Sequence, residues 1–135
     1  TELFRNTSIQ SVKAYMESQF HYWTEDEIAC NFRKMLTLEQ YRNSEMTSLY
    51  QKVLGNGPVS FIEDLFREMM EQGVWCKGEP KQMAVEFYAP FYLLLTISDA
   101  AHDKEEREEI ENLFTAHMDC FIEKYAITDG YAEKG

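Results

Sequence analysis

The stretch MAVEFYAPFYLLLTI, which runs from Met83 to Ile97, decides the fold of this chain. Only Glu86 and Thr96 in it are plainly polar, so apolar side chains occur on every side of the helix that it predicts. A helix at a protein surface keeps one polar face, and a helix without such a face needs cover all round. The stretch therefore predicts a helix packed on one side against its own domain and on the other against a second subunit or a bound molecule.

The same stretch is too short to cross a bilayer, which requires about 20 apolar residues, and it carries a carboxylate and Pro90 in its middle. The sequence contains no recognisable signal peptide or transmembrane segment, so no membrane partner is expected. Cys30, Cys76 and Cys120 are widely spaced and odd in number, which argues against a disulfide framework. A reducing cytoplasm is the expected location.

The chain has 135 residues, the size of a single domain with one hydrophobic core. We expect this domain to cover residues 1–127, followed by a frayed tail at residues 128–135. Hydrophobic residues make up 44% of the sequence and aromatic residues 14%, enough for a core and also for the lining of a cavity. The many Met and aromatic side chains fit a filled, irregular core equally well. The net charge of −11 argues against nucleic-acid binding by this chain, because phosphate contacts need clustered Lys and Arg.

Helix caps and apolar side chains spaced three or four residues apart recur along the sequence, without sustained period-two alternation. The expected fold class is therefore all α, a helical bundle. Capping boxes, cap residues and prolines mark the helix starts. The expected helices cover residues 7–23, 24–42, 43–55, 58–73, 80–101 and 103–125, and they open at Thr7, Thr24, Asn43 or Ser44, Pro58, Pro80 and Asp103.

Three local features carry further expectations. Trp75 is expected to anchor the loop at residues 74–79. Pro90 should kink its helix, because proline removes a backbone hydrogen bond, and a carbonyl just before it should be exposed. The second helix is expected to turn inward its apolar stripe of Ile28, Phe32, Met35 and Leu36, with Arg33 and Lys34 turned away.

No catalytic constellation is evident. A di-iron bundle needs a pair of Glu-x-x-His motifs, and the nearest match is a single Asp-x-x-His at residues 99–102. His117, Asp119 and Cys120 are close in sequence, but a helix points Asp119 away from His117. None of the Cys or Ser residues has a sequence context that places a base beside it, and the turn at residues 55–58 lacks the lysine of a phosphate loop. We therefore expect no enzymatic activity, no cofactor and no metal.

Glu86 is the one charged residue in the apolar stretch. Its neighbours Phe87 and Tyr88 predict that it is partly buried, where a charge needs a partner, a raised pKa or a cationic ligand. Two interpretations remain open: a hydrogen bond within the protein, to Tyr, His or Arg, or at the wet edge of the helix; and recognition of a ligand.

The order of these pieces resembles a known family. The likeness lies in residues 20–36, the following EQYRN at residues 39–43, the segment FIEDLFREMM at residues 61–70, and a closing helix pair after Glu79-Pro80. Together they resemble the C-terminal regulatory domain of TetR-family transcriptional regulators. The likeness covers most of the chain, and helix order and character carry it more than any fixed residue.

The resemblance implies a helical domain that binds a small effector and dimerises, joined to an N-terminal helix-turn-helix that reads operator DNA. The last two helices, Pro80–Ala101 and Asp103–Tyr125, would form a four-helix bundle across the dimer axis. The chain begins at Thr1 without an initiator Met and lacks the helix-turn-helix, so we expect a fragment. The expected partners are a second copy of the chain, a small and largely apolar effector, and operator DNA through the missing domain only.

The expected effector pocket is mostly apolar, and a bound ligand would favour one arrangement of the helices over another. Its candidate residues are Tyr15, Phe20, Trp23, Phe32, Met35, Phe66, Met69, Trp75, Tyr88 and Tyr92, with Glu86 as a polar anchor. The candidate dimer interface comprises Phe87, Phe91, Leu94, Leu95, Leu113, His117, Phe121 and Tyr125. Two alternatives stay open: a constitutive helical protein-interaction module with a filled core, and a small helical metalloenzyme.

Overall fold

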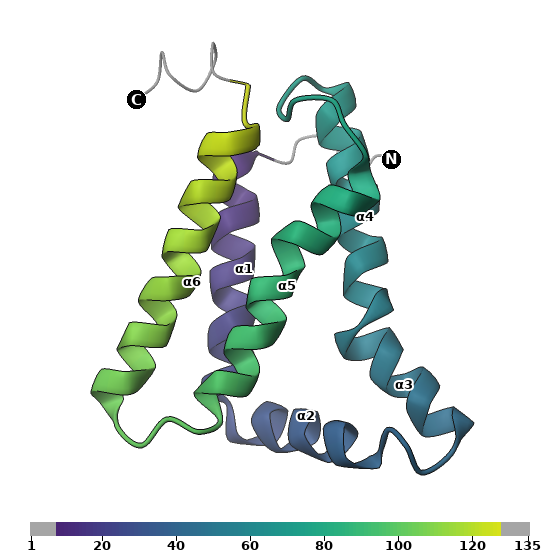
Figure 1. The fold of residues 1–135 in the computed structure, drawn as a ribbon, viewed down its shortest axis with the longest axis vertical. Coiled ribbons are helices and arrows are strands. Elements are labelled where there is room, and N and C mark those ends of the chain that lie inside the picture. The colour runs from purple at the N-terminus through teal and green to yellow at the C-terminus, as the bar shows by residue number, and fades with distance from the viewer. Residues whose placement is uncertain (1–7, 128–135) are drawn as a thin grey trace.

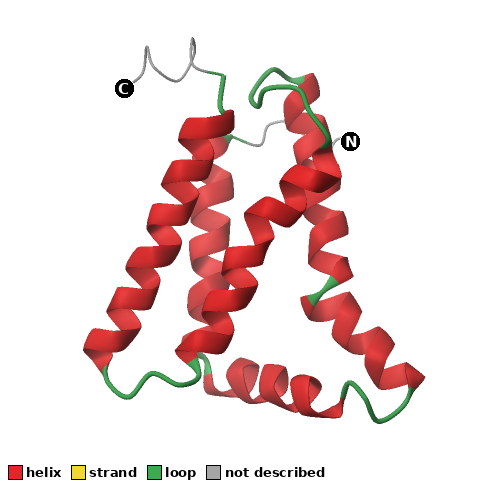
Figure 2. Cartoon of the chain, viewed as in Figure 1, coloured by secondary structure: helices red, strands yellow, loops and turns green. Residues whose placement is uncertain are grey.

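The computed structural model describes residues 8–127, and the tail expected at residues 128–135 lies outside the described residues. The described part of the chain is all α, as predicted (Figure 2). Its helices are α1 (Ile9–Glu25), α2 (Glu27–Glu39), α3 (Ser44–Leu54), α4 (Asn56–Glu71), α5 (Pro80–Ser98) and α6 (Lys104–Tyr125).

Helix α5 occupies the centre of the bundle (Figure 1). It packs against α4 on one side and against α6 on the other, and α1 contacts both α5 and α6. Helices α3 and α4 follow one another with only Gly55 between them, and α2 lies across the lower end of the view, where it joins α1 to α3. At the upper end, the loop after α4 meets the end of α6, where the backbones of Trp75 and Ala126 form an isolated bridge.

The first two helix starts differ from the sequence prediction. Ser8 caps α1: its Oγ accepts from the Ser11 N–H at 3.1 Å, and Ser11 Oγ accepts from the Ser8 N–H at 3.0 Å. The expected cap Thr7 lies outside the described residues. The capping box expected at Thr24 is wrong, because Thr24 lies inside α1 and Asp26 caps α2 instead. One residue therefore ends α1 and begins α2, and the direction of the chain changes sharply there.

The later helix starts agree better with the sequence. Asn43 and Asp103 cap α3 and α6 with their side chains, and Pro80 begins α5. Helix α4, however, begins at Asn56 instead of Pro58. A proline fits the first turn of a helix because no N–H there needs a partner within the helix, so the start can lie two residues earlier.

The orientation predicted for α2 is correct for Leu36, which is buried, and for Lys34, which is exposed, but it is wrong for Ile28, Phe32, Met35 and Arg33. The outward side carries Ile28, which is 83% exposed, together with Phe32 and Met35. The inward side consists of Ala29, Arg33 and Leu36, all buried.

The core is centred on Phe66 of α4, whose side chain is completely buried. The ring centroids of Trp75, Phe87 and Phe121 lie 5.4, 5.3 and 5.7 Å from that of Phe66, so aromatic rings from α4, α5, α6 and the α4–α5 loop meet at one point. Such ring pairs add to the free energy of burial through their edge-to-face or offset geometry. The prediction that Trp75 anchors its loop is confirmed by its burial.

Helix α5 continues through Pro90 from Pro80 to Ser98. The carbonyl of Phe87, one turn before Pro90, accepts a hydrogen bond from His117 Nε2 of α6 at 2.9 Å. This bond is a polar link between the last two helices. Within residues 8–127, no helix combines the length and the apolar character that crossing a membrane requires.

The substitution Phe66→Ala tests the position of the core. Removing a fully buried ring leaves a cavity at the meeting point of three helices, and we expect it to lower the free energy of unfolding by about 3–5 kcal/mol. The control Leu38→Ala, at a side chain 80% exposed on α2, should change it by less than about 0.5 kcal/mol. Urea unfolding followed by circular dichroism measures the free energy of unfolding of both variants. Equal losses of stability in the two variants would contradict a core centred on Phe66.

Candidate functional site

A pocket of about 270 Å³ opens between α1, the junction of α3 with α4, and α5. Its lining is largely aromatic and aliphatic, and none of the described residues that line it is Asp or Glu. The wall is formed by Tyr15, Met16, Gln19, Trp23, Lys52, Val53, Gly57, Pro58, Phe61, Ile62, Tyr88 and Phe91.

The structure brings three of the expected effector residues, Tyr15, Trp23 and Tyr88, to this pocket. The other candidates lie elsewhere. Phe20, Phe66, Met69 and Trp75 belong to the closed core, whereas Phe32, Met35, Tyr92 and Glu86 lie on other surfaces, outside the pocket lining.

The α3–α4 junction contributes the part of the wall that the sequence analysis missed. A Cβ on Gly57 would lie 2.0 Å from the carbonyl oxygen of Lys52, so only glycine allows the two helices to approach this closely. This contact places Lys52, Pro58 and Phe61 around the pocket. The glycine pair around Asn56 was a usable signal for such a close approach, but in the sequence it indicates only a turn.

Tyrosine hydroxyls tie the pocket wall to α3. The Tyr88 hydroxyl donates to the carbonyl of Leu54 at 2.6 Å, and the hydroxyls of Tyr50 and Tyr92 pair with each other. Burial raises the pKa of both Tyr88 and Tyr50 above the ordinary value, so both phenols stay neutral at physiological pH. These groups fix the spacing of α3 and α5 and bring no charge to the pocket.

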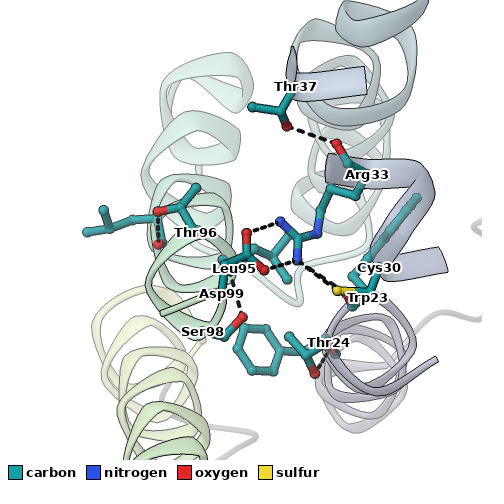
Figure 3. Close-up of polar contacts among 11 residues, drawn as sticks. Trp23, Thr24, Cys30, Arg33, Thr37, Leu95, Thr96, Ser98 and Asp99 are labelled. Carbon is teal, nitrogen blue, oxygen red and sulfur yellow. Dashed lines mark hydrogen bonds and ion pairs between the residues drawn. The ribbon is translucent and has the colours of Figure 1, made fainter. Parts of the chain in front are cut away.

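A partly buried ion pair, with its arginine inside the protein, joins α2 to the end of α5 (Figure 3). Arg33 is only 4% exposed, and its Nη1 and Nη2 donate to the two carboxylate oxygens of Asp99 at 2.9 and 2.6 Å. Nη2 also lies 3.5 Å from the carbonyl oxygen of Trp23, the residue that lines the pocket from α1. The fork of the guanidinium thus connects α2, the end of α5 and one pocket wall. The sequence pattern predicts Arg33 on the solvent side of α2 and gives no sign that Asp99 is its partner.

Helices α5 and α6 together expose a set of apolar side chains, which we call the outer face; on α5 no charged side chain lies between Glu86 and the end of the helix. Leu93 and Leu113 are 56% and 54% exposed, the largest fractions among its big side chains. Residues three or four apart lie on the same side of a helix, so Leu93 shares one side of α5 with Glu86, and Leu113 shares one side of α6 with Lys124. The ion pair between Glu86 and Lys124, at 3.2 Å, brings these two sides next to each other. The outer face consists of Val85, Ala89, Leu93, Ile97, Leu113 and Cys120.

Most of the residues expected at the dimer interface lie away from this surface. The expected contacts Phe87, Phe91, Leu94, Leu95 and Phe121 are buried inside the single chain and do not reach its surface. Phe91 even lines the pocket. Among the residues of that prediction, Leu113 lies on the outer face, while His117 and Tyr125 are half-buried and bonded to α5. The prediction chose the bulkiest side chains of α5, and those are the ones that the core takes.

Glu86 has protein partners. Its carboxylate accepts from the Tyr125 hydroxyl at 2.6 Å and from Lys124 Nζ at 3.2 Å. The hydrogen bond from Tyr125, and then those with Lys124, hold the pKa of the Glu86 carboxyl below its usual value. Of the two interpretations of Glu86, the hydrogen bond within the protein is confirmed.

A second, charged hollow of about 590 Å³ lies between α1, α2 and the start of α6. In it His21, Glu25 and Glu111 bring potential metal-ligand atoms within 4.8 Å of one another, a group that two of the described helices supply. Two of these side chains are exposed, and in the structure they form ion pairs, with His21 next to Glu25 and 3.4 Å from Glu111. The group therefore links α1 to α6 whenever His21 is protonated.

Comparison of the chain with protein-family models, with curated proteins and with solved structures found no match. The described geometry and the sequence pattern therefore carry the functional assignment.

The substitution Asp99→Ala tests the buried ion pair. It leaves the Arg33 guanidinium inside the protein without its carboxylate, and we expect the free energy of unfolding to fall by about 2–3 kcal/mol. The control Arg67→Ala removes exposed ion pairs to Glu63 and Asp64 and should have a much smaller effect. Chemical unfolding of the two variants measures the difference. An Asp99→Ala variant as stable as Arg67→Ala would refute the burial of this pair.

The His21 cluster predicts a pH dependence. The hydrogen bond with Glu25, followed by the charge of Glu111, raises the pKa of His21 above 6.5. A raised pKa means that the protonated imidazole stabilises the fold: the contribution is complete below the unfolded-state pKa and is lost as the pH rises through the folded-state value. NMR titration of the His21 ring should show this raised pKa, lowered most by Glu25→Gln and less by Glu111→Gln. A value at or below 6.5 would contradict the arrangement.

Proposed function

We propose that this chain is the effector-binding and dimerisation domain of a TetR-like transcriptional regulator. The single observation that carries the proposal is that α5 has two roles: its inner side contributes Tyr88 and Phe91 to a pocket, while its outer side exposes Leu93 among other apolar side chains. A regulator of this kind needs one element that touches both its ligand and its partner subunit.

The outer face supports pairing with a second copy. The chain carries a net charge of −11, so two copies repel each other over most of their surfaces. On α5 the outer face has no charged side chain between Glu86 and the α5–α6 loop, and the neighbouring carboxylate of Glu86 is neutralised by Lys124. On α6, the exposed carboxylate of Glu109 lies one turn before Leu113, at the margin of this face. A two-fold interface must be complementary to itself, and an apolar patch meets that condition.

The contacts of Arg33 suggest how a ligand would act at a distance. A molecule between Tyr15, Trp23 and Phe61 would press on the end of α1, where the Trp23 carbonyl meets Arg33. Arg33 lies on α2 and is held by Asp99 at the end of α5. The ligand shifts an equilibrium only if it binds two arrangements of these helices with different affinity. In the intact protein, the resemblance places an operator-reading helix-turn-helix before this domain.

The size of the pocket favours a second candidate function. Its volume of about 270 Å³ lies just below the range of about 300–1,000 Å³ that is common for ligand pockets. A constitutive helical interaction module dimerises without an effector, so it would need no ligand pocket of the usual size. Thermal unfolding midpoints that no small apolar compound raises, in a chain that still dimerises, would favour this candidate.

The substitution Leu93→Glu tests dimerisation. Light scattering at micromolar concentration should give twice the chain mass of 15.9 kDa for the unchanged protein and the single chain mass for the variant. A buried carboxylate on each side of a two-fold interface is costly because neither finds a partner. The Leu93 side chain is exposed in the single chain, so the variant should fold normally, as circular dichroism would verify.

Leu38→Glu is the matched control. It makes the same change at an exposed leucine of α2, away from the outer face, and should leave the dimer intact. A folded, unchanged protein that is monomeric at these concentrations would refute the dimer. Dissociation by Leu38→Glu but not by Leu93→Glu would place the interface on α2.

A further inference from the structure

Lys52 gives the pocket a chemical preference that its aromatic lining alone does not provide. It is the one side chain in the lining that carries a full charge at neutral pH, and it lies where the end of α3 meets α4. Within residues 8–127 no carboxylate lies within ion-pair distance of it, although the sequence has 24 acidic residues against 13 basic ones. A cation without a partner beside an apolar hollow suits a ligand with an anionic end.

The lining also sets the shape of the ligand. Rings from Tyr15, Trp23, Phe61, Tyr88 and Phe91 surround the space, and flat aromatic ligands pack against such rings in offset or edge-to-face geometry. An apolar cavity of about 150 Å³ holds one benzene molecule. The volume of about 270 Å³ found here therefore suits one aromatic ring with a short chain.

We infer that the pocket binds a small aromatic carboxylate, with the ring between α1 and α5 and the carboxylate at Lys52. This inference rests on the effector pocket of the proposed function and names its ligand class. Gln19, another polar side chain of the described wall, offers an amide N–H that can donate to the same carboxylate. Burial raises the pKa of Tyr88, so its phenol stays neutral and brings no negative charge near the ligand.

Three probes of nearly equal shape test the charge: 3-phenylpropionate, 3-phenylpropanol and 3-phenylpropylamine, titrated into the full chain by calorimetry. We expect the acid to bind about threefold to fivefold tighter than the alcohol, the range of an exposed ion pair, and the amine to bind weakest. Lys52→Met should remove the advantage of the acid and leave the affinity for the alcohol unchanged. Lys81→Met, which removes one exposed lysine of α5 outside the pocket, is the matched control and should keep that advantage.

The indole N–H signals of the two tryptophans locate the bound probe. Trp23 lines the pocket and Trp75 lies in the closed core, so the acid should shift the Trp23 signal and leave the Trp75 signal in place. Equal affinity for acid and alcohol, or an acid that binds Lys52→Met as well as it binds the unchanged chain, overturns the assigned anion and leaves an effector pocket standing. Binding without a shift of the Trp23 signal overturns the location. Absence of binding by all three probes overturns the ligand class, while the mass of the dimer tests the proposed function separately.

Discussion

The two-sided apolar character of α5 is the constraint on which the rest of the structure depends. Its inner side supplies Phe87, Phe91 and Leu95 to the core, and the other helices are arranged around these side chains. Its outer side leaves Val85, Leu93 and Ile97 partly open to solvent. Burial of apolar surface contributes roughly 25 cal/mol per Å², so these exposed side chains favour contact with a second apolar surface.

The ion pair of the buried Arg33 with Asp99 sets where α2 lies. The Arg33 guanidinium is only 4% exposed, and a charge in such a place is costly without an opposite charge beside it. Asp99, at the end of α5, supplies that charge. The pair therefore holds α2 across the foot of the bundle, beside the end of α1. Since Trp23 belongs both to this junction and to the pocket wall, a change in the pocket has a short physical route to α2.

Much of the fold follows from the sequence, because local rules govern helix starts and the pattern of α5. The caps Asn43 and Asp103 and the position of Pro80 were predictable in this way. The shared cap at Asp26 was not, since Thr24 and Glu27 offer an equally good local pattern.

The prediction of the orientation of α2 failed for a different reason. Apolar spacing predicts Phe32 inside, but Arg33 turns inward instead, to pair with a residue 66 positions later, and no local pattern contains that partner. The pocket was predicted in part. Tyr15, Trp23 and Tyr88 were identified from their type and spacing, whereas Lys52 and Phe61 reach it only because Gly57 lets two helices approach closely.

The central claim is that a second copy of this chain covers the outer face of α5 and α6. Isotope-filtered NOE spectroscopy on a mixture of labelled and unlabelled chains tests it most directly, because only contacts between chains give signals. We expect such signals from the methyl groups of Val85, Leu93 and Leu113. Signals between chains that come instead from Ile28 and Leu38 of α2, or none at all, would contradict the claim.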